Sequence, residues 1–351
     1  MKSFSDIFID STSEGTKIPK ESYLESGAHI IVDQGQKEIA GYTNEEVGLY
    51  TDVPAIIFGD HTRAIKYVDE PFFLGADGVK LLKSKDNQAN YKYLYYALRN
   101  ARIPDTGYNR HFKWLKEISI QYPDSKQQAK IVEILDNLSA IINARHDELV
   151  KFDDLIKARF VEMFGNPVTN EKGWPCKSIS ELTTKIGSGA TPKGGKESYR
   201  EEGITLIRSM NVHNGEFDYK DLAHISDEQA AKLDGVTIEP HDVLLNITGA
   251  SVARSCVVPN EILPARVNQH VCILRCKEHV IPEFLNRLLI DDNYQSLLWS
   301  IAGSGATREA ITKQQVEDLQ IILPPITAQK EFVEFVKQVD KSKVVEISEA
   351  A

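Results

Sequence analysis

The chain has 351 residues, a length that predicts two domains and leaves room for a third. Hydrophobic residues make up 42% and charged residues 26%, which excludes an intrinsically disordered chain, and four cysteines are too few for a disulfide scaffold. The net charge of −10 excludes a protein that coats nucleic acid by bulk charge, although a local basic surface is compatible with it.

The N-terminal segment carries no recognisable targeting signal. Residues 1–10 reach acidic side chains before any apolar run of signal-peptide length. No stretch approaches the roughly 18 uncharged apolar residues that a membrane span needs. We therefore expect a cytoplasmic protein without membrane contact, and the low cysteine content fits a reducing compartment.

Short motifs recur in the same order in the two halves of the chain. The separation between partners grows from 176 to 201 residues, as expected when the second of two copies carries loop insertions. The pairs are Lys20–Tyr23 with Lys196–Tyr199, Gly27 with Gly203, Gly78–Leu82 with His270–Leu274, Tyr93–Leu94 with Phe284–Leu285, Gly107 and Arg110 with Gly305 and Arg308, and Ile120–Pro123 with Ile321–Pro324. The order indicates a duplicated domain.

Each copy follows the same predicted plan. Short β-runs with Gly-rich turns come first, for example Pro54–Phe58 and Asp242–Asn246. A short amphipathic helix follows at Tyr91–Asn100 and Pro282–Asp291, and a last strand ends at a proline before a long helix. The strand period and the helix period alternate within each copy, which predicts a mixed α/β domain.

The long helix of the first copy is predicted over residues 126–164. A capping box at Ser125–Gln128 starts it and Gly165–Pro167 ends it, so it spans about 58 Å. Its apolar residues alternate in steps of four and three, the spacing of a coiled-coil seam. The seam residues are Ile131, Leu135, Leu138, Ile142, Leu149, Phe152, Ile156 and Phe160.

A second helix is predicted from about residue 327 to about residue 345. Phe332, Val336 and Val339 form its seam. We expect the two helices to form an antiparallel coiled coil; the alternative is two ordinary amphipathic core helices. The predicted fold class is α+β, with two tandem pseudo-symmetric domains and a helix pair, and the expected segments are residues 1–124, 125–165, 166–325 and 326–351.

At this level of detail the chain resembles the specificity (S) subunits of type I restriction-modification systems. The matching segments are Lys157–Pro167, similar to the end of that family's central helix, Ile186–Pro192, similar to the opening loop of its second target-recognition domain, Val267–His270, similar to a strand start, and Ala306–Ile311 with Leu323–Gln329, similar to the exit into the last helix. The last helix is about half as long as is usual in the family.

The resemblance implies a DNA-recognition subunit that catalyses no reaction. Each domain would read one half of a split double-stranded DNA target, and the helices would set the spacer and dock two methyltransferase (M) subunits. Restriction (R) subunits would complete the complex. No cofactor is expected in this chain; S-adenosylmethionine would bind the M subunits, and ATP and Mg²⁺ the R subunits.

Candidate DNA-binding residues are polar side chains near the predicted loops. Arg, Lys, Asn, Gln and His suit base edges, while Lys, Arg, Ser and Thr suit phosphates. In the first copy they are His61, Arg63, Tyr108, Asn109, Arg110, His111 and Lys113. In the second copy they are Ser188, Thr191, Lys193, Lys196, Arg208, Asn211, Arg254, Arg266, Gln269, His270 and Arg308. A solvated turn is the alternative interpretation of residues 107–113.

Other sites are weakly indicated. The run Gly189–Glu197 is one residue too long for a phosphate-binding loop. A nuclease pattern at Asp105 and Asp124 is better explained if Asp124 caps a helix. A zinc site is also suggested by His270, Cys272, Cys276 and His279. These side chains lie too far apart along a predicted strand over residues 267–276 to bind one zinc ion together. The rival functions are a stand-alone nuclease or methyltransferase, and a silent scaffold that no longer reads DNA.

Overall fold

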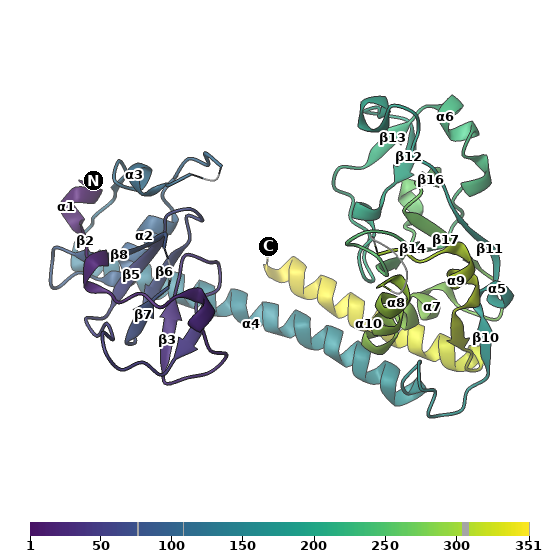
Figure 1. Ribbon diagram of the computed structural model, residues 1–351, viewed down its shortest axis with the longest axis horizontal. Coiled ribbons are helices and arrows are strands. Elements are labelled where there is room, and N and C mark those ends of the chain that lie inside the picture. The colour runs from purple at the N-terminus through teal and green to yellow at the C-terminus, as the bar shows by residue number, and fades with distance from the viewer. Residues whose placement is uncertain (76, 108, 304–308, 351) are drawn as a thin grey trace. The chain divides into compact units, whose positions relative to one another are not determined.

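The computed structural model describes residues 1–75, 77–107, 109–303 and 309–350, and it is built from mixed helices and strands (Figure 1). The chain divides into two compact units, Met1–Ala144 (unit 1) and Arg145–Ala351 (unit 2). None of the described helices is long and apolar enough to cross a membrane.

Unit 1 contains three small sheets and a covering helix. Its strands are β1 (Lys2–Ser3), β2 (Phe8–Asp10), β3 (His29–Val32), β4 (Gly41–Thr43), β5 (Ala55–Gly59), β6 (Ile65–Val68), β7 (Phe72–Leu74), β8 (Val79–Ser84) and β9 (Ser119–Ile120). Its helices are α1 (Phe4–Ile7), α2 (Tyr91–Arg99), α3 (Phe112–Leu115) and the 3₁₀ turns at Thr12–Glu14 and Lys20–Ser22. The strand orders are β2-β8-β5-β6, β4-β3-β7 and β1-β9.

The core of unit 1 lies on both faces of β5. All five residues of this strand are buried, as its unbroken apolar sequence predicts for a central strand. Ile56 and Phe58 pack with Leu94 of α2 on one face. Ile57 packs with Phe72 of the second sheet on the other face. The sheet is therefore covered on both sides, and its loops are the parts left at the surface.

Unit 2 repeats this arrangement. Its strands are β10 (Cys176–Ser178), β11 (Thr183–Ser188), β12 (Ile204–Ile207), β13 (Ala223–Ile225), β14 (Val243–Asn246), β15 (Ser255–Val257), β16 (Ala265–Val267), β17 (Val271–Cys276) and β18 (Gln320–Ile322). Its shorter helices are α5 (Ile179–Leu182), α6 (Asp227–Ala231), α7 (Pro282–Leu289), α8 (Asp292–Gly303), α9 (Lys313–Asp318) and the 3₁₀ turns at Gly195–Ser198, Ser209–Asn211, Asp234–Val236 and Asn260–Ile262. The strand orders are β11-β17-β14-β15, β13-β12-β16 and β10-β18.

The strand register confirms the duplication that the sequence motifs predict. Gly59 pairs with Val79 in unit 1, and Asn246 pairs with Val271 in unit 2, so the segments aligned by sequence occupy the same sheet position. In both units an edge strand runs antiparallel to the unit's last strand, in the pairs β1-β9 and β10-β18. A capping box starts the following short helix in each unit. The expected fold class, two tandem domains of one mixed topology, is confirmed.

One predicted strand is interrupted. Residues 267–276 were expected to form a single strand, but β16 ends at Val267 and β17 begins at Val271 in a different sheet. The residues between them form a tight connection, because the side chain of Asn268 accepts a hydrogen bond from the amide of His270 at 3.0 Å. Local Asx bonding of this kind competes with the strand ladder.

Helix α4 (Ser125–Phe164) has a different start from the expected capping box. The carboxylate of Asp124 accepts from the amide of Gln127 at 2.9 Å and caps the helix. Gln128 instead donates to the carbonyl of Pro123 at 2.8 Å. The Ser125 capping box is therefore wrong, because the helix begins at Ser125 itself and the residue before it supplies the cap.

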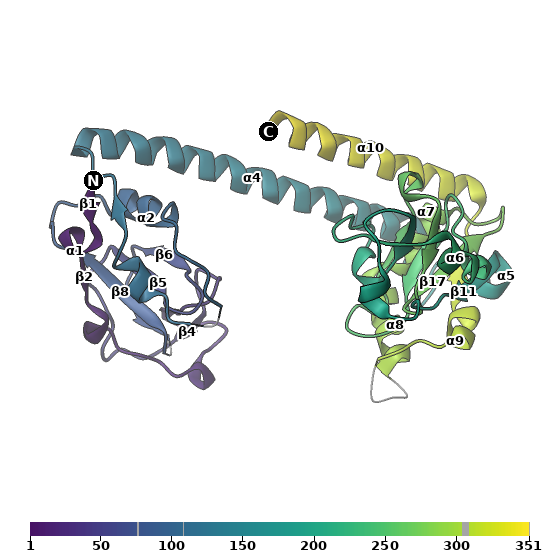
Figure 2. The ribbon, with the colours of Figure 1, turned by 90° about the horizontal axis from the view of Figure 1, so that it is seen from above.

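Helix α10 (Ile326–Ala350) runs antiparallel to the second part of α4 within unit 2, and the two lie side by side in Figures 1 and 2. Arg159 of α4 pairs with Glu331 at 2.8 Å, and Asp153 pairs with Lys343 at 2.7 Å, so the numbering ascends on one helix as it descends on the other. The helix ends at residue 350, beyond the expected end near residue 345.

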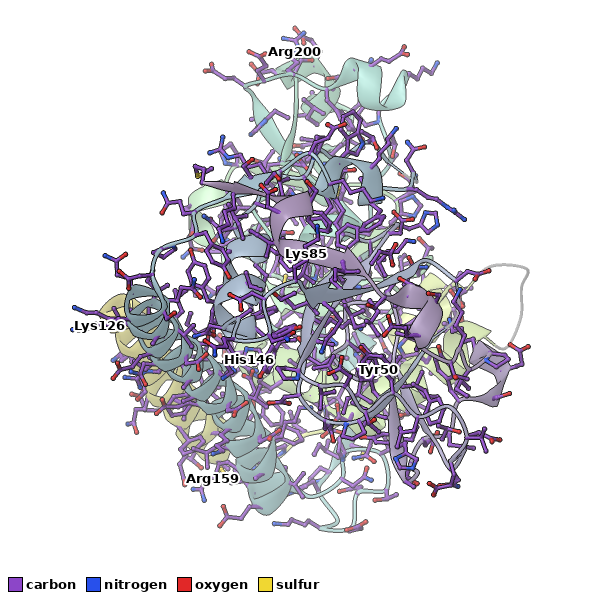
Figure 3. All side chains as sticks on the ribbon, turned by 90° about the vertical axis from the view of Figure 1, so that its left-hand side faces the viewer. Tyr50, Lys85, Lys126, His146, Arg159 and Arg200 are labelled. Carbon is purple, nitrogen blue, oxygen red and sulfur yellow. The ribbon has the colours of Figure 1, made fainter. Side chains whose placement is uncertain are left out.

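The seam between these helices is unevenly buried. Ile156, Phe160, Phe332, Val336 and Val339 are buried in one apolar cluster, and Phe152 packs against it. Leu149 and Leu135 are half-buried. Ile131, Leu138 and Ile142 are 37%, 49% and 67% exposed, against the expectation of a continuous seam. Figure 3 labels Lys126, His146 and Arg159 along this helix.

Candidate nucleic-acid interface

The loops that carry most of the candidate residues begin at the same pair of backbone hydrogen bonds in each unit, which we call the loop root. In unit 1 the amide of Asp60 donates to Gly78 at 2.7 Å, and the amide of His111 donates to Asp60 at 2.8 Å. These two hydrogen bonds form the loop root of unit 1 and join the loops after β5, before β8 and before α3. The loops therefore meet at one end of the sheet, where polar side chains can form a single surface.

Unit 2 contains the same loop root. The amide of Ile247 donates to His270 at 2.9 Å, and the amide of Ile311 donates to Ile247 at 2.8 Å. Ile247, His270 and Ile311 thus correspond to Asp60, Gly78 and His111 of unit 1. The backbone hydrogen bonds of the loop root are the same in both units, while the residues that make them differ.

A hydrogen-bonded network joins three loops of unit 2 at this end. The hydroxyl of Thr191 lies 2.5 Å from the side-chain oxygen of Gln269, and the Gln269 amide nitrogen lies 3.0 Å from His270 Nε2. His270 Nδ1 lies 2.5 Å from the hydroxyl of Thr248. Thr191, Gln269 and His270 are all predicted DNA-binding residues, and the fold brings the three together.

Hydrogen bonds orient the side chains of this network relative to one another. Because Thr191 donates to the oxygen of Gln269, the amide nitrogen of Gln269 faces His270 and donates to Nε2. The other ring nitrogen, Nδ1, shares a hydrogen bond with the hydroxyl of Thr248. The side chains are held in fixed positions before any ligand arrives, as a site that reads base edges requires.

A surface hollow of about 580 Å³ adjoins this network. It is lined by Ser209, Met210, Thr248, Gly249, Ala250, Ser251, Arg254, His270, Glu309 and Ala310. Arg254 is half-buried, and no hydrogen bond or ion pair joins its guanidinium to another of the described residues. Such a guanidinium suits two ligand groups, the acceptor edge of guanine and a phosphate.

The loop after β11 presents small and basic residues. Ser188 and Lys193 are exposed. Gly189 donates its amide to the carbonyl of Asn268 at 3.1 Å, and a Cβ at this position would lie 1.8 Å from the carbonyl oxygen of Val267. Only glycine allows this approach, so the loop is held against the β16-β17 connection.

Three candidate residues of unit 2 are occupied inside the fold. Asn211 is fully buried, and its amide nitrogen donates to the carbonyls of Asp218 and Lys220. Arg266 is 9% exposed and donates to Ala230, Ala265 and Asp234. The Arg208 guanidinium donates to the carbonyl of Asp221 and lies 5.5 Å from the Tyr199 ring. We leave these three out of the proposed interface.

His111 of unit 1 is also a structural residue. It is 1% exposed, with Nδ1 3.1 Å from the carbonyl of Asp60 and Nε2 3.3 Å from the hydroxyl of Thr106. The buried carboxylate of Asp60 accepts from the amide of Phe112 at 2.7 Å. These bonds hold the loop root rather than face solvent.

The other described candidates of unit 1 are exposed or half-buried. Arg63 donates to Asp105 at 2.7 Å, and the amide of Gly107 together with Arg63 lowers the pKa of that carboxyl below its ordinary value. Arg110 has a side chain that is 78% exposed, 4.0 Å from Asp60. Lys113 is exposed over the ring of Trp114, the amide of His61 donates to Gln34, and Asn109 donates to the carbonyl of Thr106.

Three predicted residues cannot be placed. Tyr108 and Arg308 lie outside the described residues, and the side chain of Lys196 is not among those that the structure describes. The alignment of Gly107 and Arg110 with Gly305 and Arg308 falls partly on the same undescribed segment.

Sequence reasoning missed several residues at this end of unit 2. Thr248 and Ser251 line the hollow, and the buried Asn268 fixes the β16-β17 connection. The available signal was the position of Thr248 and Ser251 just after the apolar strand Val243–Asn246, since the residues after a central strand form its loop.

The alternative chemistries find little support in the described residues. Burial raises the pKa of the Cys256, Cys272 and Cys276 thiols to about 12, and the described residues contain no group of three His, Cys, Asp or Glu side chains placed to hold a metal. Asp105 pairs with Arg63 and Asp124 caps α4, so each carboxylate has a structural role.

Comparison with known proteins gives one consistent result. A family model described as "Type I restriction modification DNA specificity domain" matches residues 2–151 and again residues 171–349. The specificity subunit of the type I restriction enzyme EcoR124I/EcoR124II from Escherichia coli is 24% identical over 345 residues, which cover 92% of this chain and 82% of that protein. The putative MjaX specificity subunit of Methanocaldococcus jannaschii is 21% identical over 298 residues, 77% of this chain and 66% of that protein.

A solved structure shares the fold. The crystal structure of the type I restriction-modification S subunit from M. genitalium superposes with a TM-score of 0.55 at 15% identity, over 99% of this chain and 91% of that one. The duplicated topology is therefore found beyond this chain.

Proposed function

Because this chain belongs to the family of type I restriction-modification DNA specificity subunits, we propose that each of its two units reads one half of a two-part DNA target. Specificity subunits of these systems recognise DNA, assemble with M and R subunits, and are not themselves catalytic. The observation that carries the proposal is the repeated loop root, at Asp60, Gly78 and His111 and again at Ile247, His270 and Ile311. Two copies of one support with different loops suit two different half-sites.

In unit 2 the reading surface consists of the hollow and the network beside it. Arg254 contributes donors that suit the acceptor edge of guanine, and His270 and Gln269 are held in place by Thr191 and Thr248. Ser188 and Lys193 on the neighbouring loop suit phosphate contacts.

In unit 1 the proposed surface is more basic and less enclosed. Arg110 and Lys113 are exposed beside the loop root, and Arg63 is held by Asp105. The proposed contacts to phosphate come from Arg110 and Lys113.

The helices are the proposed docking site for two M subunits. On the first part of α4 the side chains of Ile134, Leu138, Ile141 and Ile142 are 50%, 49%, 57% and 67% exposed. Such a row of large apolar residues is typical of a helix that meets another protein. The net charge of −10 agrees with a subunit whose binding to DNA depends on basic surfaces of its partners.

A domain exchange tests two-part reading. Residues 1–124 are replaced with the first domain of another family member, the chain is expressed with its M partner, and methylated sites in genomic DNA are mapped. We expect one half-site to change and the other to remain. A change in both half-sites would exclude separate reading, and no methylation together with no band shift would support a silent scaffold.

A point substitution tests the surface of unit 2. Arg254→Ala removes the donors in the hollow, and we expect about 10-fold to 100-fold weaker binding to the wild-type target, with relaxed selection at one base pair of the unit 2 half-site. Lys177→Ala, which removes the same charge at β10, is the control and should change binding far less. Equal effects of the two substitutions in titrations at fixed salt would refute base reading by Arg254.

A further inference from the structure

Strand β6 forms one edge of the four-stranded sheet of unit 1, next to helix α2 (Figures 1 and 2). The amide of Gly59 donates to the carbonyl of Ala64 at 2.8 Å, and hydrogen-bonded pairs alternate with non-bonded pairs along an antiparallel ladder. The amides and carbonyls of Ile65 and Tyr67 therefore point away from the sheet. Within the part of the chain that the structure describes, no hydrogen bond occupies these four outward groups.

Unit 2 covers the same edge with a segment of its own. By strand register, Ser255 of β15 stands at the position of Ile65. The carbonyl of Ser255 accepts from the amide of Gly215 at 2.8 Å, and its amide donates to the side-chain oxygen of Asn214 at 3.3 Å. A turn in the connection between β12 and β13 thus occupies the outward groups of β15.

The connection that would cover the edge in unit 1 is shorter. Residues 208–222 join β12 to β13, whereas only residues 33–40 join β3 to β4. The shorter connection turns back on its own strand, because the amide of Ala40 donates to the carbonyl of Ile31 at 2.9 Å. Unit 1 therefore leaves open an edge that unit 2 closes.

Two surface hollows adjoin the open edge. One has a volume of about 310 Å³ and is lined by Ile65, and the other has a volume of about 350 Å³ and is lined by Tyr67. Glu38 and Tyr95 line both hollows, so the two are adjacent along the strand. Together they form a groove between α2 and the connection before β4, which we call the β6 groove.

We propose that the β6 groove binds an extended, basic segment of a partner chain, which adds to the sheet as a further strand. The outward groups of Ile65 and Tyr67 supply two donors and two acceptors, the set that strand addition uses. The duplication supports this mode of binding, because Gly215 and Asn214 already bond to the corresponding edge of unit 2.

Charge at the groove defines the partner further. Glu38, Asp69 and Glu70 line the hollow beside Tyr67 and are exposed, and among the described residues none of the three forms an ion pair. Such carboxylates attract lysine and arginine side chains and repel the phosphates of DNA. The favoured occupant is therefore a basic protein segment rather than nucleic acid.

The same carboxylates disfavour a second copy of this chain. Pairing of two β6 edges would bring Glu38, Asp69 and Glu70 of one copy close to those of the other, and like charges across paired strands are destabilising. The edge of β15 is also unsuited to this role, because its Ser255 is already bonded to Gly215 and Asn214. The partner is thus a different chain.

The test uses fluorescent peptides and the full-length protein without DNA. The probe is a peptide of alternating arginine and threonine, about eight residues long. One control peptide has glutamate in place of arginine, and a second is the probe with every backbone amide methylated, which keeps the charge but removes the donors. By fluorescence anisotropy at fixed salt we expect each control to bind about 10-fold more weakly than the probe, or less.

Variants of the protein locate the binding. Glu70→Lys should weaken binding of the probe about threefold, whereas Glu117→Lys, an exposed residue that lines neither hollow, should leave it unchanged. Ile65→Pro removes one outward amide, a change that an edge strand accommodates, and should weaken binding about fivefold. Circular dichroism and melting show whether each variant is folded.

Hydrogen exchange of the wild-type protein gives a readout that needs no variant. The amides of Ile65 and Tyr67 should exchange quickly in the free chain and slowly with the probe bound, while the amide of Gly59 should be slow in both.

Four outcomes would overturn the proposal. They are equal binding of the probe and the methylated peptide, no binding to folded protein, slow exchange of both outward amides in the free chain, and dimers of the free chain that Ile65→Pro dissociates. The last outcome would favour a second copy as the occupant. Because DNA is absent, none of these outcomes depends on target recognition.

Discussion

The two units share one backbone arrangement but differ in the chemistry of its interior. At the loop root, unit 1 has Asp60 and His111 where unit 2 has Ile247 and Ile311, with the same backbone hydrogen bonds. In the sheet, strand register places the buried Lys66 opposite Ile57, at the position that Cys256 takes opposite Leu244 in unit 2. Backbone geometry is thus preserved while polar and apolar side chains replace one another, because Asp60, His111 and Lys66 each have a hydrogen-bond partner within unit 1.

The largest expected difference between the units concerns the helix wall. Phe332→Ala should destabilise unit 2 by about 3–5 kcal/mol, because the ring is fully buried against Phe160 and Phe164. The corresponding Ile131→Ala should cost about 1 kcal/mol, since Ile131 is 37% exposed. Calorimetric unfolding of both variants measures the contrast. Equal losses would show that Ile131 is covered in the free chain as fully as Phe332.

The next effect tests the polar loop root. Asp60→Ala removes the acceptor of the Phe112 amide and should cost about 1–3 kcal/mol, because a buried donor is left unpaired. Asp105→Ala is the matched control and should cost far less, since its carboxylate is 66% exposed and solvent screens its pair with Arg63. Denaturant titrations compare the two. If the Asp105 variant loses as much, the root does not depend on the buried carboxylate.

The smallest effect is a pH dependence from a buried lysine of unit 1, at the position that Cys256 takes in unit 2. Lys66 is fully buried, donates to the carbonyl of Lys37 at 2.5 Å and lies 3.6 Å from Asp33. Burial lowers its pKa below the ordinary 10.5, against the opposing effect of Asp33. Between the lowered pKa and 10.5 the unfolded chain binds a proton that the folded unit does not, so this residue makes stability rise with pH there.

Lys66→Met should remove that rise. The difference in melting temperature between wild type and Lys66→Met, followed from about pH 8 to pH 10, isolates the lysine from the tyrosines that also titrate near this range. We expect the variant to be relatively more stable at the lower pH and to lose this advantage as the pH rises. A constant difference would mean that Lys66 stays protonated in the folded unit.

The sequence was sufficient to predict the duplication and its register. The alignment of Gly78 with His270 and of Gln128 with Gln329 recurs in the hydrogen bonds of the structure, because these residues sit where strands and helices end. The long helix was predicted to within one residue at its start for the same reason: an apolar period and a terminator define it locally.

The recognition surface was less predictable. Asn211, Arg266 and His111 have the right chemistry for DNA, yet each has hydrogen-bond partners within its own unit. Residue type shows which bonds a side chain can make, while the three-dimensional environment decides whether the fold has already used them. The break between Val267 and Val271 was missed for a related reason, since the side chain of Asn268 ends a strand that the apolar pattern would continue.

The loop root also bears on how such a protein diversifies. Backbone atoms make both loop roots, at Asp60, Gly78 and His111 and again at Ile247, His270 and Ile311. The loop root therefore tolerates either a polar or an apolar set of residues. Loops that begin and end at the loop root can therefore be exchanged between domains without a change in the sheet. Each loop root is thus a position at which recombination can replace a DNA-reading surface and leave the rest of the domain intact.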